Sequence, residues 1–353
     1  MKICVHFQRN EKQQAFGGVR LVKSIKGALD VANIRYARND IEYYDILHCC
    51  SINDETKIND AIEDGKKVVF SALMSENDTQ TRLLTIKDKT YCLSSRELSI
   101  LNKVDLILVC DEISKKILVE KGVTTRIDVV PVGVNSSRFL FVNEQEDNIF
   151  YNYYQLSKET KFIVSSGTYE DKDNFDDLIE IAKLCPKYYF YYFGFSKSHK
   201  VPYKNKNIPN NLKFHTLINE EIYRSMMKNA SIYLSFDNSR HSPISLFDAA
   251  SSSTQIVSLE PNGLNSEILN KLGAYTGKTI KEVGNIINKL FNNELEFNVS
   301  KAKQIAYDNS LKALGNALKE EYSSIMKGEE NAWSKINNWE PWINFSKISK
   351  KRM

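Results

Sequence analysis

The sequence predicts an α/β protein of two domains, each built around a parallel β-sheet. Three observations support this prediction. The chain has 353 residues, which is long for a single hydrophobic core and suits two domains. Short apolar runs alternate with amphipathic helical patterns along most of the chain, as they do in βαβ units. The alternation stops over residues 140–160 and then begins again.

The first half, residues 1–145, contains the elements of one such domain. Short runs rich in Val, Ile, Leu and Phe predict strands at residues 2–7, 44–50, 66–73, 104–110 and 126–134. Apolar residues at helical spacing predict helices at residues 17–32 and 111–122. Asp111 is a suitable N-cap for the second helix, and Gly122 is a suitable end for it.

Residues 140–160 are rich in acidic, amide and aromatic side chains, and we expect them to form a linker. The second domain is then expected over residues 158–325. Its strands are predicted at residues 161–169, 188–196, 211–217, 231–236 and 254–260, and its helices at 174–185, at 219–230 and from about 242. Residues 326–353 are expected to form a helical tail that returns toward the N-terminal domain and packs through Trp333, Trp339 and Trp342.

Composition excludes several classes of protein. The net charge of +4 is mild and no basic-aromatic motif is present, so we expect no nucleic-acid partner. The six Cys residues show no metal-ligand spacing, which favours buried free thiols in a reducing compartment. No apolar run reaches the length of a membrane span, and the first residues lack a signal-peptide pattern. A cytoplasmic location is therefore expected.

The stretch "SRHSPISLFDAASSSTQIV", residues 239–257, predicts a polar loop, a short helix and a strand in that order. Pro243 is suited to the first turn of a helix. The first N–H groups of a helix lack partners within it and carry partial positive charge. Small side chains allow an anion such as a diphosphate to approach these groups. The alternative interpretation is a capped helix that only packs on a sheet.

Several segments, in order, resemble the retaining, nucleotide-sugar-dependent glycosyltransferases of the GT-B fold, the family 4 group. "AFGGVRLVKSIKGAL" resembles the family's Gly-Gly loop and first helix, and "YYDILHCCS" resembles its "yDvvHvh" strand. "KVDLILVCDEISKKILVEKGVTTRIDVVPVGVNSSRF" resembles its "aD.ii.vS" helix followed by "v.vipnGvd...f". "FIVSSGTYEDKDNFDDLIEIAK" resembles the start of its donor domain, and "LFDAASSSTQIVSLEPNGLNSEIL" resembles "lEAmAcG.PVv.....Gg..Eii".

The resemblance implies two Rossmann-like domains facing a cleft. The C-terminal domain would hold a nucleotide-diphosphate sugar, for which a UDP-sugar is expected, and the N-terminal domain would hold a saccharide or lipid-linked acceptor. Neither a metal nor another cofactor is implied, because helix-end N–H groups and basic side chains neutralise the diphosphate. We expect a role in bacterial surface polysaccharide synthesis. Such a role predicts peripheral contact with the inner face of the cell membrane, through the N-terminal domain or the basic tail at residues 346–353.

The resemblance also implies particular site residues. Asp248 falls where the family's second motif Glu binds the ribose hydroxyls, and Gly17 and Gly18 would approach the diphosphate. The full donor-binding set is Gly17, Gly18, Gly167, Ser242, Ile244, Ser245 and Asp248. The alternatives are a simple strand-to-helix turn at the two glycines and an exposed helical Asp at position 248.

The sequence departs from the family pattern at its charged positions. Arg240 stands where the family has its first motif Glu, and His241 stands where a Gly is usual. The family's Arg and Lys pair is replaced by Thr168 and Asp173, with Lys172 one step out of register. We assign catalytic roles to Arg240, His241 and Lys172, which would stabilise the leaving diphosphate. For Lys172, a solvated loop lysine is the alternative.

Three functions remain open from the sequence. The first is a hexosyltransferase. The second, supported by the departures, is a catalytically inactive GT-B-like partner or chaperone subunit of an active glycosyltransferase. The third is another enzyme with two Rossmann-like domains, such as a sugar-nucleotide epimerase, which explains the Gly-Gly loop but not the matches in the second half.

Overall fold

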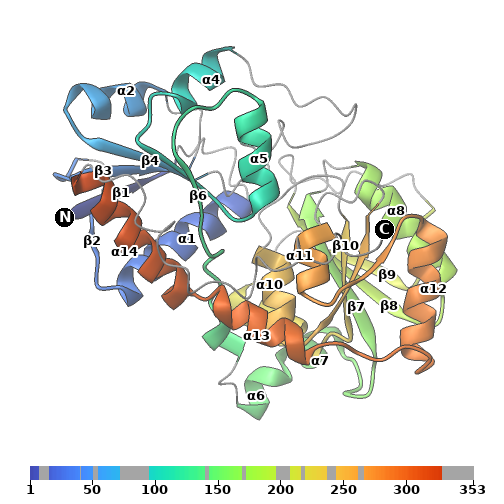
Figure 1. Cartoon of the computed structure of the whole chain (residues 1–353). Helices are drawn as coiled ribbons and strands as arrows, with labels where there is room; N and C mark the ends of the chain where they lie inside the picture. Colours follow the sequence, from blue (N-terminus) through green and yellow to red (C-terminus); the bar gives the residue numbers. More distant parts are fainter. Residues whose placement is uncertain are drawn as a thin grey trace, which may run out of the picture.

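The computed structural model of the chain describes residues 1–7, 16–39, 41–50, 55–71, 95–139, 143–168, 172–195, 207–215, 219–236, 244–260 and 266–327. These residues form two α/β domains, each around a six-stranded sheet (Figure 1). Every strand pairing in both sheets is parallel. The predicted fold class, two α/β domains with parallel sheets, is therefore confirmed.

The N-terminal sheet has the strand order β2-β1-β3-β4-β5-β6. Its strands are β1 (Lys2–His6), β2 (Arg35–Tyr36), β3 (Ile46–Cys49), β4 (Lys67–Ser71), β5 (Leu106–Val109) and β6 (Ile127–Val129). Its helices are α1 (Phe16–Val31), α2 (Glu55–Glu63), α4 (Ser95–Leu101) and α5 (Glu112–Glu120). Every residue of β3 and β5 is buried, because helices cover both faces of a parallel sheet. Asp111 accepts a hydrogen bond from the Ser114 N–H at 2.7 Å, which confirms it as an N-cap.

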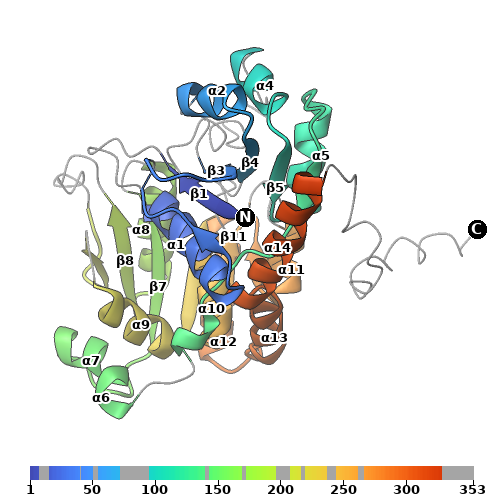
Figure 2. The same ribbon diagram turned by 90° about the vertical axis from the view of Figure 1, so that its left-hand side faces the viewer.

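The second sheet has the order β12-β11-β10-β7-β8-β9, and its strands β7, β8 and β11 are labelled in Figure 2. Its strands are β7 (Phe162–Thr168), β8 (Tyr189–Phe195), β9 (Leu212–His215), β10 (Ile232–Phe236), β11 (Gln255–Leu259) and β12 (Tyr275–Gly277). Its helices are α8 (Lys172–Leu184), α9 (Glu220–Asn229), α10 (Ile244–Ser251), α11 (Ser266–Lys271) and α12 (Ile280–Phe291). The short edge strands β2 and β12 and the helices α2, α4 and α11 are elements that the sequence analysis did not predict.

The predicted linker at residues 140–160 requires correction. After the 3₁₀ helix η1 (Ser136–Phe139), the chain forms the helices α6 (Glu144–Asp147) and α7 (Ile149–Tyr154). Phe150 is fully buried and stacks on Phe162 of β7, with ring centroids 4.7 Å apart, and its N–H donates to the Ser225 hydroxyl at 3.0 Å. Phe150 and Tyr151, within the predicted linker, are core residues of the second domain, whereas Tyr153 is exposed.

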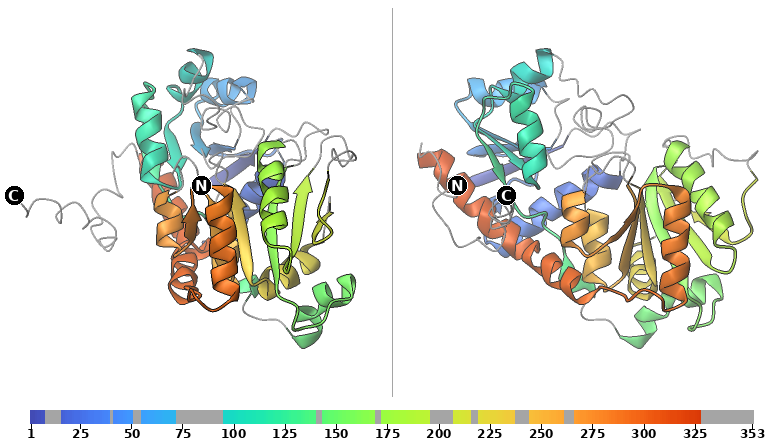
Figure 3. Two further views of the ribbon diagram at one scale, coloured as in Figure 1. Left: turned by 90° about the vertical axis from the view of Figure 1, so that its right-hand side faces the viewer. Right: turned by 45° about the vertical axis from the view of Figure 1, so that its right-hand side comes forward.

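The chain returns to the N-terminal domain through α13 (Ser300–Asp308) and α14 (Leu311–Lys327). Val134, on the segment that leaves the N-terminal domain, forms an isolated parallel β-bridge with Ser310, which lies between α13 and α14. The Leu311 N–H donates to the Val134 carbonyl at 3.0 Å. Helix α14 then runs beside α1 and joins the core of the N-terminal domain (Figures 1 and 3). The return begins at residue 311 rather than at 326. Nearly all of the predicted tail, with its three Trp residues, lies outside the described residues.

The contact between α14 and α1 is close enough to require a glycine. A Cβ at Gly315 would collide with the Ala28 carbonyl oxygen and lie 3.0 Å from the Ala32 Cβ. We predict that Gly315→Ala lowers the free energy of unfolding by about 1–3 kcal/mol, because overpacking exceeds the gain in helix propensity. Urea denaturation measures this change. Asn316→Ala, at the exposed neighbouring position, is the control and should be neutral or slightly stabilising.

Two buried polar contacts also hold α14 in place. The His48 Nδ1 lies 2.5 Å from the Tyr322 hydroxyl, and both side chains are fully buried. Burial lowers the pKa of His48 to about 3, so the imidazole is neutral. Arg126 lies 2.6 Å from Glu321 of α14 and 2.6 Å from Asp128 of β6. The arginine therefore joins a carboxylate of each element, since an unpaired buried charge would be costly.

Glu321 makes stability depend on pH. Burial and the neighbouring Asp128 raise its pKa from 4.5 to about 7, although Arg126 acts in the opposite direction. Between these two values the folded protein keeps a proton that the unfolded chain has lost. This group therefore makes the free energy of unfolding fall as pH rises from about 4.5 to 7.

We predict that Glu321→Gln reduces this slope, because a neutral amide cannot lose the proton. Denaturation curves at several pH values between 4.5 and 7.5 for the wild type and the variant measure it, with about 1.4 kcal/mol lost per pH unit as the upper limit for one group. An unchanged slope in the variant would contradict the assignment.

Candidate functional site

The candidate site lies where the direction of strand addition reverses in the second sheet. Strand β7 comes first in the sequence, β8 and β9 are added on one side, and β10 to β12 are added on the other. Ligands of open parallel sheets bind at the carboxyl ends of the strands at this point. β7 and β10 are neighbours that pair near their amino ends, with Ile163 opposite Ile232 and Val164 opposite Tyr233.

Two helices begin near this edge. Helix α8 begins at Lys172, shortly after β7, and α10 begins at Ile244, after β10. The first N–H groups of a helix have no partners within the helix and lie at the positive end of its dipole. Such a pair of helix starts at neighbouring strand ends suits an anionic ligand such as a diphosphate.

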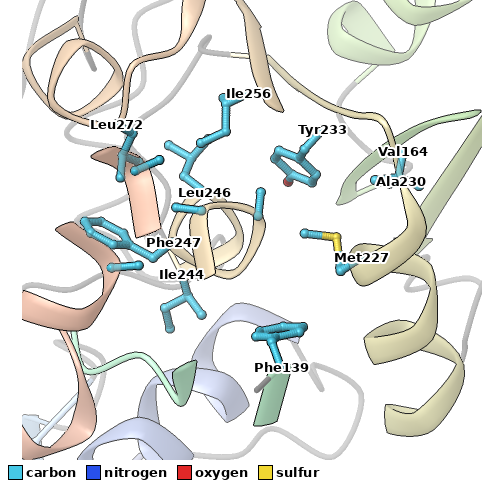
Figure 4. Close-up of a cluster of buried hydrophobic side chains, with 14 of the residues drawn as sticks. Phe139, Val164, Met227, Ala230, Tyr233, Ile244, Leu246, Phe247, Ile256 and Leu272 are labelled. Atoms are coloured by element: carbon cyan, nitrogen blue, oxygen red, sulfur yellow. The ribbon is translucent and has the colours of Figure 1, made fainter. Parts of the chain in front are cut away.

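Helix α10 is buried on all sides. Every residue of the helix except Ser245 is buried, and its apolar side chains contact the sheet, α9 and η1 (Figure 4). Ile244 packs near Phe139 of η1, whereas Leu246 lies toward Ile256 of β11. This packing fixes the direction of the helix, and the first turn is the part that remains for a ligand.

Asp248 is held by the protein itself. Its side chain is 1% exposed, and its Oδ2 lies 2.5 Å from the Arg138 guanidinium. The Tyr223 hydroxyl donates to the same oxygen at 2.9 Å. This geometry corrects the alternative of an exposed helical Asp. It also differs from a carboxylate aimed at ribose, because the short side chain stays close to the helix, where Arg138 neutralises it.

Arg138 connects three elements around this carboxylate. It extends from η1, contacts Asp248 on α10, and lies 2.5 Å from Glu220 on α9. Its guanidinium also stands 5.3 Å from the centre of the Tyr223 ring, a cation–π contact. Arg138 and Tyr223 were not identified from the sequence, because they are 110 and 25 residues from Asp248 and no local pattern links them.

The structure places the predicted glycines differently. Gly17 and Gly18 lie inside the first turn of α1 and not in a preceding loop, and the start of α1 is on the side near the second domain (Figures 1 and 3). Gly167 lies in β7, and a Cβ there would come within 2.7 Å of the Tyr192 hydroxyl. A glycine is therefore needed at position 167, because a larger residue would collide with Tyr192. Ser245 is half-buried in the first turn of α10.

The predicted catalytic residues are mostly outside the described part of the chain. Arg240, His241 and Ser242 fall outside it, and Lys172 is described only as the first residue of α8. Their roles stay predictions. Within the described residues, no group of three or more His, Cys, Asp or Glu side chains is arranged to hold a metal ion.

This arrangement of two parallel-sheet domains with a returning C-terminal helix is the GT-B fold of glycosyltransferases. It is similar to sucrose-phosphate synthase from Thermosynechococcus elongatus, with a TM-score of 0.69, 11% identity, and coverage of 93% of this chain and 100% of that one. It is also similar to HepE of Anabaena in complex with UDP-glucose, with a TM-score of 0.68, 13% identity, and coverage of 92% and 100%.

One protein is also similar in sequence. The processive diacylglycerol alpha-glucosyltransferase of Acholeplasma laidlawii is 20% identical over 333 residues, which are 93% of this chain and 99% of that protein. No protein-family model matches the chain.

We predict that Arg138→Met destabilises the protein by about 3 kcal/mol, because it leaves the buried Asp248 without its cation. The double variant Arg138→Met/Asp248→Asn should recover much of the loss, since no buried charge then remains. Arg224→Met is the matched control, because Arg224 is equally buried but its partner Glu146 is 38% exposed, and it should cost about 1 kcal/mol or less. Thermal unfolding measures all three. Equal losses in the two arginine variants would contradict the role given to Asp248.

Proposed function

We propose that the protein is a glycosyltransferase that takes a hexose from a nucleotide-diphosphate sugar, with UDP-sugars as the expected donors. The observation that carries this proposal is the strand reversal at β7 and β10, which brings two helix starts to one edge of the sheet. The similarity to HepE, whose structure contains UDP-glucose, supports a nucleotide sugar as the donor.

The proposed reaction breaks the bond between the anomeric carbon and the diphosphate oxygen, and the electron pair leaves with the diphosphate. An acceptor hydroxyl forms the new bond to that carbon and loses its proton, with retention of the anomeric configuration. The N–H groups at the start of α10 and the side chains of Arg240, His241 and Lys172 would stabilise the leaving diphosphate without a metal ion. Ser242, Ile244 and Ser245 would contribute their N–H groups, and Asp248 would position the helix.

The acceptor is proposed to be a saccharide or a lipid-linked saccharide used for bacterial surface polysaccharide. The relative from Acholeplasma laidlawii, which its name describes as acting on diacylglycerol, supports a lipid acceptor. Such an enzyme would work in the cytoplasm at the inner face of the membrane, through peripheral contact. Among the helices that the structure describes, none combines the length and apolar character needed to cross a bilayer.

The similarities to glycosyltransferases do not favour the second candidate, an inactive partner of an active glycosyltransferase, although one contact is compatible with it. Asp248 is engaged by Arg138 and Tyr223, so it does not present a free carboxylate to ribose. The two candidates differ in a measurable way, because only the enzyme breaks the bond between sugar and diphosphate.

The test is incubation with UDP-glucose, UDP-galactose, UDP-N-acetylglucosamine and GDP-mannose, followed by measurement of released nucleoside diphosphate. We predict slow hydrolysis of at least one donor. Arg240→Ala should reduce that rate by about 100-fold or more, as expected when a group that stabilises leaving-group charge is removed. Arg35→Ala is the control, because Arg35 is exposed on strand β2. This variant should keep the wild-type rate. Binding of a nucleotide without any hydrolysis or transfer would favour the inactive partner.

A further inference from the structure

Glu260 is a buried carboxylate whose partners among the described residues, Lys278 and the Thr276 hydroxyl, leave one of its oxygens without a hydrogen bond. It follows β11 directly and is 5% exposed. Its N–H continues the sheet by donating to the Gly277 carbonyl at 2.9 Å. Among the described residues, no group donates a hydrogen bond to its buried Oε1. Burial raises the pKa of Glu260, while Lys278 and the Thr276 hydroxyl act in the opposite direction.

The side chain of Glu260 is on the α10 face of the sheet. Side chains of a strand alternate between its two faces. Val257 and Leu259 belong to the cluster with α8 and α12, whereas Ile256 belongs to the cluster with α10. Glu260 is four residues after Ile256 and continues the same ladder, so it shares the face of Ile256.

Glu260 also lies beyond the first turn of α10. The Thr254 N–H donates to the Ala249 carbonyl at 2.9 Å, which places the start of β11 level with the last turn of α10. From there, six residues of strand advance about 20 Å, whereas the helix from Ala249 back to Ile244 advances only about 8 Å. The carboxylate is therefore on the side of the helix start where a bound diphosphate and its sugar would lie.

We propose that Glu260 is a specificity-determining residue that accepts hydrogen bonds from hydroxyl groups of the donor's hexose. This inference rests on the proposed function and adds to it the part of the donor that Glu260 recognises. A carboxylate is an acceptor with four lone-pair sites and suits two neighbouring hydroxyls. It repels phosphate, so it favours the neutral sugar over the diphosphate.

The charge pattern of the chain supports this assignment. The position where the resembled family has its first motif Glu is occupied by Arg240, which favours phosphate over sugar hydroxyls. Asp248 is already paired with Arg138. Glu260 therefore supplies, from a different strand, a carboxylate at the same edge of the sheet. Hydroxyl groups of the sugar would also donate hydrogen bonds to the buried Oε1 of Glu260, which is otherwise a desolvated acceptor.

The experiment compares the binding of nucleotides with and without a sugar. Titration calorimetry gives Kd values for UDP, GDP, UDP-glucose, UDP-galactose, UDP-N-acetylglucosamine and GDP-mannose with the wild type, Glu260→Gln and Glu260→Ala. We expect both variants to bind the nucleoside diphosphate as the wild type does. They should bind its preferred sugar conjugate about 10- to 100-fold more weakly, the usual effect of losing hydrogen bonds to a charged group.

Ser258→Ala is the matched control, because Ser258 is fully buried two residues earlier on the same face of β11. It should leave the ratio of the two Kd values unchanged. A wild-type ratio in both Glu260 variants, or an equal loss of affinity for the diphosphate and for its sugar conjugate, would overturn the assignment of Glu260 alone. A wild-type protein that binds none of the six compounds would overturn the proposed function, and the inference with it.

Discussion

The parallel pairing of β7 with β10 is the contact on which the candidate site depends. Because these two strands are neighbours but are separated in sequence by β8 and β9, the helices that follow them begin beside one another. An order that placed another strand between β7 and β10 would separate the starts of α8 and α10. The Ser166 and Tyr233 hydroxyls, 2.8 Å apart, form a polar contact between the same two strands.

The two domains are joined by a double connection. Val134, where the chain leaves the N-terminal domain, forms a β-bridge with Ser310, where the chain comes back. Helix α14 then packs on α1. The first turn of α1 lies toward the second domain, so the packing of α14 on α1 also bears on where Gly17 and Gly18 are held. The close approach at Gly315 leaves this packing little freedom, because not even a Cβ fits at that position.

Buried carboxylates are treated in three different ways. Glu321 shares Arg126 with Asp128 and joins the N-terminal sheet to the returning helix. Asp248 is neutralised by Arg138 and joins α10 to η1 and α9. Glu260 is buried at the edge of the sheet, with an oxygen that no described group hydrogen-bonds. Glu321 and Asp248 each lie within 2.6 Å of a largely buried arginine, whereas the groups that act on Glu260 are Lys278 and the Thr276 hydroxyl. This difference in pairing distinguishes Glu260 from the other two.

The sequence by itself determined the class of fold, because the period of apolar residues follows directly from the geometry of strands and helices. It also indicated the helix at residues 244–251 and its polar approach. Local pattern failed at residues 143–154, because Phe150 and Tyr151 stand among acidic and amide residues but are buried in the second domain. It also failed at residue 311, where the chain leaves the second domain. Only the tertiary structure decided the partner of Asp248 and the surroundings of Glu260. Those contacts join residues from 16 to 110 positions apart, and their geometry depends on strand order and packing, which no local pattern encodes.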